Sequence, residues 1–169
     1  MATRGFTVVE LIITITIMGI LLLLTVVSLT SSQISARDDE RISDVESIQA
    51  ALESFYSVGN GSLSTVGYYP TVAITGSTDI TRSFLTDINV KSLTAPGITD
   101  TTQTFVAATN NTQTVEGVSP PPTISQYIYQ PIMSDGTLCT AGNTDCRKYN
   151  LYYRLEKDNT IYMVTSKNQ

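Results

Sequence analysis

The feature that most limits what this chain can fold into is an apolar run from Phe6 to Leu29, preceded by one cation, Arg4. A helix from Leu11 to Leu29 rises about 1.5 Å per residue and spans roughly 28 Å. That length is close to the ~30 Å hydrocarbon thickness of a bilayer. The run therefore predicts a helix that crosses a membrane.

One carboxylate, Glu10, lies inside this run. A charged side chain at the middle of a membrane helix costs roughly 2.5–3.5 kcal/mol on insertion scales. A secretory signal peptide does not account for it, because its apolar stretch is shorter and Ser28-Leu29-Thr30 is a poor cleavage site. A plain membrane anchor accounts for the length but not for Glu10. The simplest alternative is a carboxylate at the headgroup boundary, neutralised by water.

Composition excludes several classes of function. The chain has 169 residues, enough for one folded domain beside a membrane segment, and a net charge of −5. That balance argues against nucleic acid as the main partner, because phosphate binding needs clustered Lys and Arg. The absence of His removes the commonest general base and zinc ligand, so we expect no enzyme, no cofactor and no metal site. The spacing of Asp135, Asn143 and Asp145 fits no calcium loop.

The two cysteines, Cys139 and Cys146, lie close together without CxxC spacing. Two thiols alone do not make a structural zinc site, so the spacing favours a short disulfide loop in an oxidising compartment. A pair of reduced thiols is the alternative.

The stretch Arg4-Gly5-Phe6-Thr7-Val8-Val9-Glu10 resembles the cleavage motif of type IV pilins and of the pseudopilins of type II secretion systems. In that family a short basic leader ends in Gly, the prepilin peptidase cuts before an aromatic residue, and Glu stands fifth after the cut. The resemblance implies cleavage between Gly5 and Phe6 and N-methylation of Phe6. It also places the Glu10 carboxylate against the Phe6 amine of an adjoining subunit, where the opposite charge compensates it.

The resemblance and the residue pattern together predict five segments. No proline occurs before Pro70, and apolar residues recur at helical spacing beyond the membrane run, with Asp44, Glu46 and Glu53 expected on the opposite face. Gly59-Asn60-Gly61 then ends the helix. The segments are a leader (1–5), the transmembrane half of the helix (6–30), its amphipathic half (31–58), a variable Thr/Ser-rich region (59–123) and an antiparallel sheet with the disulfide loop (124–169). The expected apolar stripe comprises Ile42, Val45, Ile48, Leu52 and Phe55.

The fold class we expect is α+β, with the long helix packed against a small antiparallel β-sheet head as in type IV pilins. Alternation predicts strands over Gln126–Gln130, Lys148–Glu156 and Thr160–Thr165. One face of this sheet covers the amphipathic half of the helix. A short helix is expected within Asp79–Leu93, and Ala95–Pro122 reads as a stiff, Thr-rich connector.

These observations predict a structural protein rather than a catalyst. The single cation before the apolar run keeps the N-terminus cytoplasmic, so the head is expected outside the cytoplasmic membrane and then in an extracellular filament. Its expected partners are copies of itself in a helical fibre, the prepilin peptidase, the pilus assembly machinery and, before assembly, membrane lipid. Two rivals stay open: a pseudopilin of a secretion or DNA-uptake system, and a membrane-anchored adhesin or binding module in which Glu10 is incidental.

Overall fold

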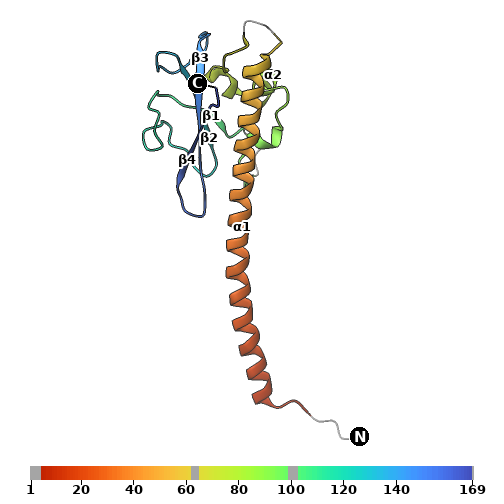
Figure 1. Ribbon diagram of the computed structural model, residues 1–169. Coiled ribbons are helices and arrows are strands. Elements are labelled where there is room, and N and C mark those ends of the chain that lie inside the picture. The colour runs from red at the N-terminus through yellow and green to blue at the C-terminus, as the bar shows by residue number, and fades with distance from the viewer. Residues whose placement is uncertain (1–4, 62–64, 99–102, 169) are drawn as a thin grey trace. The chain divides into compact units, whose positions relative to one another are not determined.

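The computed structural model describes residues 5–61, 65–98 and 103–168, and its backbone forms two compact units. The first, the N-terminal unit, ends at Ala36, and the second, the head, begins at Arg37. The predicted leader residues 1–4, including Arg4, lie outside the described residues. The elements in chain order are α1, η2, α2, η3 and β1–β4 (Figure 1).

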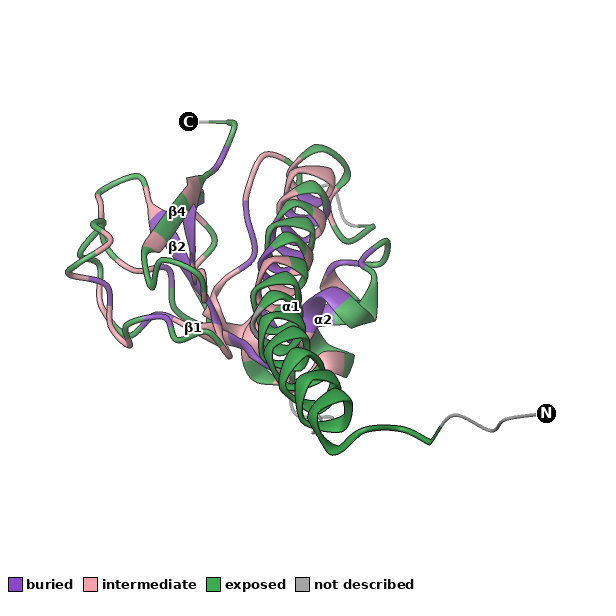
Figure 2. Ribbon diagram, turned by 90° about the horizontal axis from the view of Figure 1, so that it is seen from below, coloured by how far each residue is buried: buried purple, intermediate pink, exposed green. Residues whose placement is uncertain are grey.

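Helix α1, Val8–Val58, contributes its first half to the N-terminal unit. A stretch of it has a mean hydropathy of 2.7 and is long and apolar enough to cross a membrane. The side chains described for this stretch are exposed (Figure 2). Four threonine hydroxyls interrupt the apolar surface, and each donates to a helix carbonyl three or four residues earlier, at 2.7–3.1 Å. These polar groups are thus satisfied within the helix, as hydrocarbon surroundings require.

The second half of α1 belongs to the head and buries the predicted stripe except at its first member. Val45, Ile48, Leu52 and Phe55 are buried, whereas Ile42 is 36% exposed. At 100° per residue Ile42 projects about 120° away from Ile48, off the buried face. The prediction that Asp44 and Glu53 lie on the solvent face of the helix is wrong. Asp44 is buried beside the sheet, and the half-buried Glu53 reaches it with its longer side chain.

The sheet has four strands in the order β1-β2-β3-β4. β2 (Tyr127–Met133), β3 (Cys146–Arg154) and β4 (Ile161–Thr165) form the predicted antiparallel meander. The prediction of a wholly antiparallel sheet is wrong, because β1 (Phe105–Ala107) adds to β2 in parallel and makes the sheet mixed.

The inner face of the sheet packs on α1 through an aromatic core. Side chains that alternate along β2 and β3 join the helix stripe, and Leu155 packs at its edge, as the strand pattern predicts. Tyr129 and Tyr149 have ring centroids 5.9 Å apart, and Tyr69 meets Tyr149 edge-on at 4.8 Å. Such tilted and edge-on pairs add to what area burial alone contributes. The buried strand residues of this core are Phe105, Tyr127, Tyr129, Cys146, Tyr149, Leu151 and Tyr153.

The outer face of the sheet is covered by the segment between β1 and β2. Most of this segment belongs to the region that the sequence analysis predicted to be a stiff connector. Ala108 and Val118 pack with Ile128 and Tyr152 in a second buried cluster. The crossover that a parallel strand pair needs therefore forms a third layer of the head.

Gln130, fully buried on β2, fastens this layer to the sheet. Its amide nitrogen donates to the backbone oxygens of Asn110 (2.8 Å) and Thr112 (3.1 Å). Its amide oxygen accepts from Asn150 Nδ2 and the Tyr152 hydroxyl, both at 2.9 Å. All four hydrogen bonds available to a glutamine amide are made.

The remaining helices belong to the chain between the end of α1 and β1. Helix α2 (Thr78–Phe84) and the 3₁₀ turn η3 (Val90–Leu93) occupy the region Asp79–Leu93 in which one short helix was predicted, and a further 3₁₀ turn, η2 (Val72–Gly76), precedes them. Helix α1 ends where the sequence indicates: the Gly59 amide donates to Phe55 O at 2.7 Å, and Gly59 has φ of 72°. That left-handed conformation is one that glycine adopts without strain.

We predict that Gln130→Leu destabilises the head by about 2–4 kcal/mol, because it leaves Asn150 and Tyr152 without partners in a buried site. Denaturant unfolding of the full chain in detergent, followed by tyrosine fluorescence, measures the change. Gln113→Leu, an exposed position in the same covering segment, serves as the control. Equal unfolding midpoints for the two variants would contradict the assigned role.

Candidate functional site

The residues at the start of α1 form a complete helix cap. Thr7 precedes the helix, and its carbonyl accepts the first helical bond from the Leu11 amide at 3.2 Å. The Thr7 hydroxyl accepts from the Glu10 amide at 3.2 Å. In return Glu10 Oε2 accepts from the Thr7 amide at 3.3 Å and from the Thr7 hydroxyl at 3.1 Å. This reciprocal arrangement is a capping box.

The cap gives Glu10 a local partner that sequence reasoning missed, although its signature, Thr-x-x-Glu before an apolar run, was present. Phe6 and Leu11 occupy the positions on either side of the box at which a hydrophobic staple forms. The same few residues therefore match two patterns, a helix start and a leader-cleavage motif. Within this chain the Glu10 carboxylate is hydrogen-bonded, but no cation of the described residues pairs with it.

The predicted cleavage position is open to an enzyme. Gly5, Phe6 and Thr7 lie before the first residue of α1, and Phe6 is 77% exposed. A peptidase needs its scissile bond in an extended, accessible conformation, and the Gly5–Phe6 bond lies outside the helix. Removal of the leader would leave the Thr7 amide intact as a peptide nitrogen, so the capping box survives the cut.

The two cysteines form the predicted disulfide, with Cα atoms 5.7 Å apart and both residues buried. The loop that they close is held against the chain that follows α1. The Cys139 carbonyl accepts from the Val72 amide at 3.1 Å, and the Cys146 carbonyl accepts from the Tyr69 amide at 2.8 Å. These two hydrogen bonds hold the segment after α1 against both ends of the disulfide loop.

A cluster of charges joins the start of the head to the β3–β4 turn, and the sequence analysis did not identify it. Asp38 and Arg41 are buried and paired at 2.8 Å. The Asp38 carboxylate also accepts from the backbone amides of Glu156 (2.8 Å) and Lys157 (2.9 Å). Arg37 clasps the Glu156 carboxylate with two hydrogen bonds, at 2.9 and 2.6 Å. These charges fix the turn to the helix.

Glu53 performs a similar task at the other end of the helix. Its carboxylate accepts from the hydroxyls of Tyr69 (2.9 Å) and Tyr149 (3.0 Å). It also accepts from the Lys167 amide at 3.0 Å and from Asn168 Nδ2 at 2.8 Å. Four donors therefore compensate one acid, and the residues after β4 are bound to α1. Burial raises the pKa of Tyr69 to about 12, which keeps its hydroxyl a donor.

Among the described residues no group of three acidic, Cys or His side chains is arranged to hold a metal ion. The carboxylates near the disulfide already have partners: Asp135 accepts from Thr137, and Asp145 accepts from Ser134 and Arg147. These bonds lower the pKa of both carboxyl groups.

No protein-family model, no curated protein and no solved structure matches this chain. A functional conclusion therefore depends on the chain's own residues. The polar side chains with several partners lie at the capped start of α1, in the cluster of Arg37, Asp38 and Arg41, and around Glu53.

We predict that Thr7→Val costs about 1 kcal/mol of stability in the first helical turn, because the Glu10 amide loses its acceptor. Amide hydrogen exchange at Glu10, measured in micelles, should quicken by about fivefold, while Thr7→Ser leaves it unchanged. Thr14→Val is the matched control, since its hydroxyl donates to Leu11 O and takes no part in the cap. Identical exchange in the Val and Ser variants would rule out the capping box.

The Arg37–Glu156 pair should make the head sensitive to acid. Hydrogen bonds and charge from Arg37 lower the pKa of Glu156 below its ordinary value of 4.5. Stability from this pair is therefore complete above pH 4.5 and is lost as the pH falls through the lowered pKa. Burial raises the pKa of Asp44, so Asp44 contributes a slope of opposite sign.

We predict that Glu156→Gln lowers the unfolding free energy at pH 7 and lowers it by less at pH 3. Denaturant unfolding of the full chain at the two pH values gives the comparison. The exposed Glu116→Gln, which no ion pair of the described residues involves, should match the parent chain at both pH values. A Glu156 effect of equal size at pH 3 and pH 7 would contradict the electrostatic origin.

Proposed function

We propose that this chain is a structural subunit of a type IV pilus filament. The observation that carries the proposal is the run of basic residue, Gly, Phe and, four residues later, Glu, immediately before an apolar helix long enough to cross a membrane. The subunit is held in the cytoplasmic membrane with its head outside. A prepilin peptidase removes residues 1–5, and the assembly machinery moves the chain into a helical fibre.

The chemistry of the N-terminus explains how such a subunit enters a fibre in register. Cleavage creates a cationic amine on Phe6, where the precursor has only a neutral amide. In a fibre built by staggered packing of α1 helices, the Glu10 carboxylate of one copy meets the methylated Phe6 amine of the next. Both groups are then compensated in an apolar core, whereas a misplaced subunit leaves two charges unpaired at a cost of several kcal/mol. The pairing therefore selects one register.

The capping box lowers the free-energy cost of holding the Glu10 carboxylate in the membrane before assembly. Before assembly, Glu10 accepts two hydrogen bonds from Thr7, so the carboxylate is partly satisfied in the membrane monomer. During docking the carboxylate gains the partner amine and can retain the bond from the Thr7 amide. A carboxylate has enough acceptor positions for both partners.

The capping box also supports a second candidate, a membrane-anchored binding module. If Glu10 serves only to begin the helix, no second copy is needed to explain it. In that case the leader is retained and the head acts alone. A pseudopilin is a third possibility, with the same N-terminal chemistry but a short fibre; long surface fibres labelled by an antibody to the head distinguish a pilin from it.

Glu10→Gln separates these functions, because glutamine keeps the capping box but removes the charge. We expect this variant to be cleaved normally and to lose filament assembly, measured as sedimentable fibre from the cell surface. Mass spectrometry of the parent chain should find an N-terminal peptide that begins at N-methylated Phe6.

Thr7→Val is the complementary variant, which weakens the cap and keeps the charge, and it should still assemble. A mature chain that begins at Met1, or normal fibres from Glu10→Gln, would refute the proposed function and favour the anchored module.

A further inference from the structure

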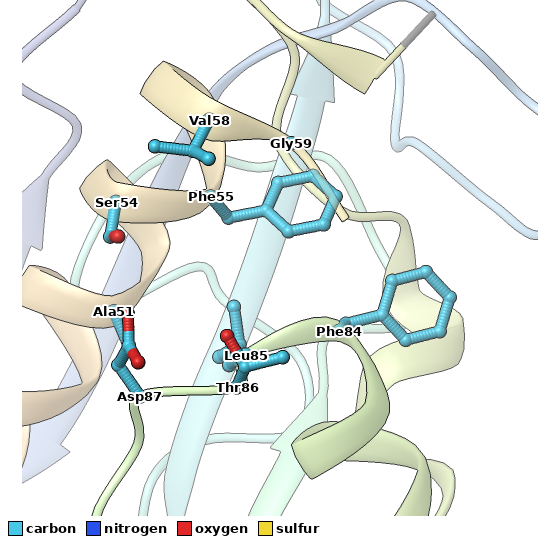
Figure 3. Close-up of a pocket in the computed structure, with 9 residues that line it drawn as sticks. All are labelled: Ala51, Ser54, Phe55, Val58, Gly59, Phe84, Leu85, Thr86 and Asp87. Atoms are coloured by element: carbon cyan, nitrogen blue, oxygen red, sulfur yellow. The ribbon is translucent and has the colours of Figure 1, made fainter. Parts of the chain in front are cut away.

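A small cavity lies between the last turns of α1 and the segment after α2, within the head. Its volume is about 80 Å³, whereas a single water needs roughly 10–15 Å³ by the same kind of measure. Figure 3 shows the Asp87 carboxylate beside Ala51 and near the Ser54 hydroxyl, with the rings of Phe55 and Phe84 on the other side. The cavity thus has one acidic, hydroxyl-bearing side and one aromatic side.

Three features of this cavity favour a cation. Asp87 makes no hydrogen bond or ion pair with the other described residues. The last turn of α1 contains no basic residue, so the negative end of a 51-residue helix is not neutralised by its own side chains. The tilted rings of Phe55 and Phe84, with centroids 6.2 Å apart, offer π-faces that attract an ammonium group.

A suitable cation lies at the opposite end of the head. The described head has five cationic side chains without an ion pair: Arg82, Lys148, Arg154, Lys157 and Lys167. The Arg154 guanidinium already donates to the carbonyl of Pro122 and to Asn159. Arg82 is on α2, and Lys167 is bound through its backbone to Glu53, so both lie near the cavity end of the head. Lys148 pairs in the sheet with Ile132, and it lines a surface hollow with Tyr56 of the last α1 turn.

Of the other four, only Lys157 is far from the cavity. Its backbone amide is bound to Asp38, about 17 residues and roughly 25 Å along α1 from Phe55. It is exposed, and the neighbouring Asp158 carboxylate is already engaged by the Thr160 amide and the Tyr162 hydroxyl. Because the Asp87 carboxylate and the Lys157 ammonium belong to opposite ends of the head, they can meet only between copies.

We propose that the head binds a second copy of itself head to tail, with Lys157 of one copy placing its ammonium group in the Asp87 cavity of the next. Such a contact is heterologous, so it repeats along an axis and does not close into a pair. This inference rests on the proposed function, since it identifies the contact between heads that accompanies packing of the α1 helices. The contact is a specificity element, because a like charge at either end opposes it.

A carbodiimide tests the contact, because it joins a carboxylate to an amine only where the two touch, forming an amide and taking up the lost water. Fibres of the full chain are treated with it and digested. We expect a cross-linked peptide pair containing Asp87 and Lys157. Lys157 is held beside Asp38, roughly 25 Å along α1 from the Phe55 that lines the cavity, so such a pair reports contact between copies.

Matched variants make the result specific. Lys157→Arg keeps the cation but offers no amine, so fibres should form and the cross-linked pair should disappear. Asp87→Lys should reduce sedimentable fibre several-fold, and combining it with Lys157→Asp should restore it. Asp79→Asn, an exposed acid on α2 outside the cavity, should leave both fibre and cross-link unchanged.

The outcomes also separate the two proposals. Fibres that form without an Asp87–Lys157 cross-link, or a charge swap that fails to restore assembly while each single variant keeps its tyrosine fluorescence and disulfide, would refute the head contact alone. A chain that is never cleaved and never sediments as fibre would refute both. Uptake of free methylammonium by the cavity without any cross-link would show a simple cation site and would also overturn the contact proposed here.

Discussion

Burial of the tyrosine-rich inner face of the sheet against the second half of α1 is the interaction on which the head depends. A four-stranded sheet with one three-residue edge strand has too little core of its own, and the helix provides the missing layer. The interface is not purely apolar. Asp38, Asp44 and Glu53 each place a carboxylate along it and receive backbone amides or tyrosine hydroxyls from the sheet side. Apolar burial supplies most of the stabilisation, and these acids set the position of the helix along the sheet.

Local patterns in the sequence were sufficient for the elements whose cause is local. The long helix and its end at Gly59 follow from the absence of proline and from glycine at the stop, and alternation locates β2, β3 and β4. β1 was missed because it has three residues and pairs in parallel with a strand more than twenty positions later, so neither length nor a turn signals it. The acids at the interface were misplaced because an Asp or Glu on a helix ordinarily faces water. Their donors, such as Tyr127 for Asp44, lie far along the chain.

The start of α1 shows how one short sequence can satisfy two physical demands. A helix that begins near a membrane surface has free amides, which a Thr and a Glu three residues apart satisfy. A fibre that packs such helices needs one charge that recognises a neighbour. Glu10 meets the first demand in the structure and is proposed to meet the second. The capping hydrogen bonds alone therefore do not reveal which of the two demands the residue serves.

Gln130 fastens the outer layer through main-chain atoms, so the exposed side chains of that layer are independent of how it is attached. Because the amide grips the main-chain oxygens of Asn110 and Thr112, the outward side chains of that layer, such as Gln113 and Glu116, carry no part of the fastening. Substitutions at these exposed positions can therefore change the surface chemistry of the head without altering the hydrogen bonds that fasten the layer.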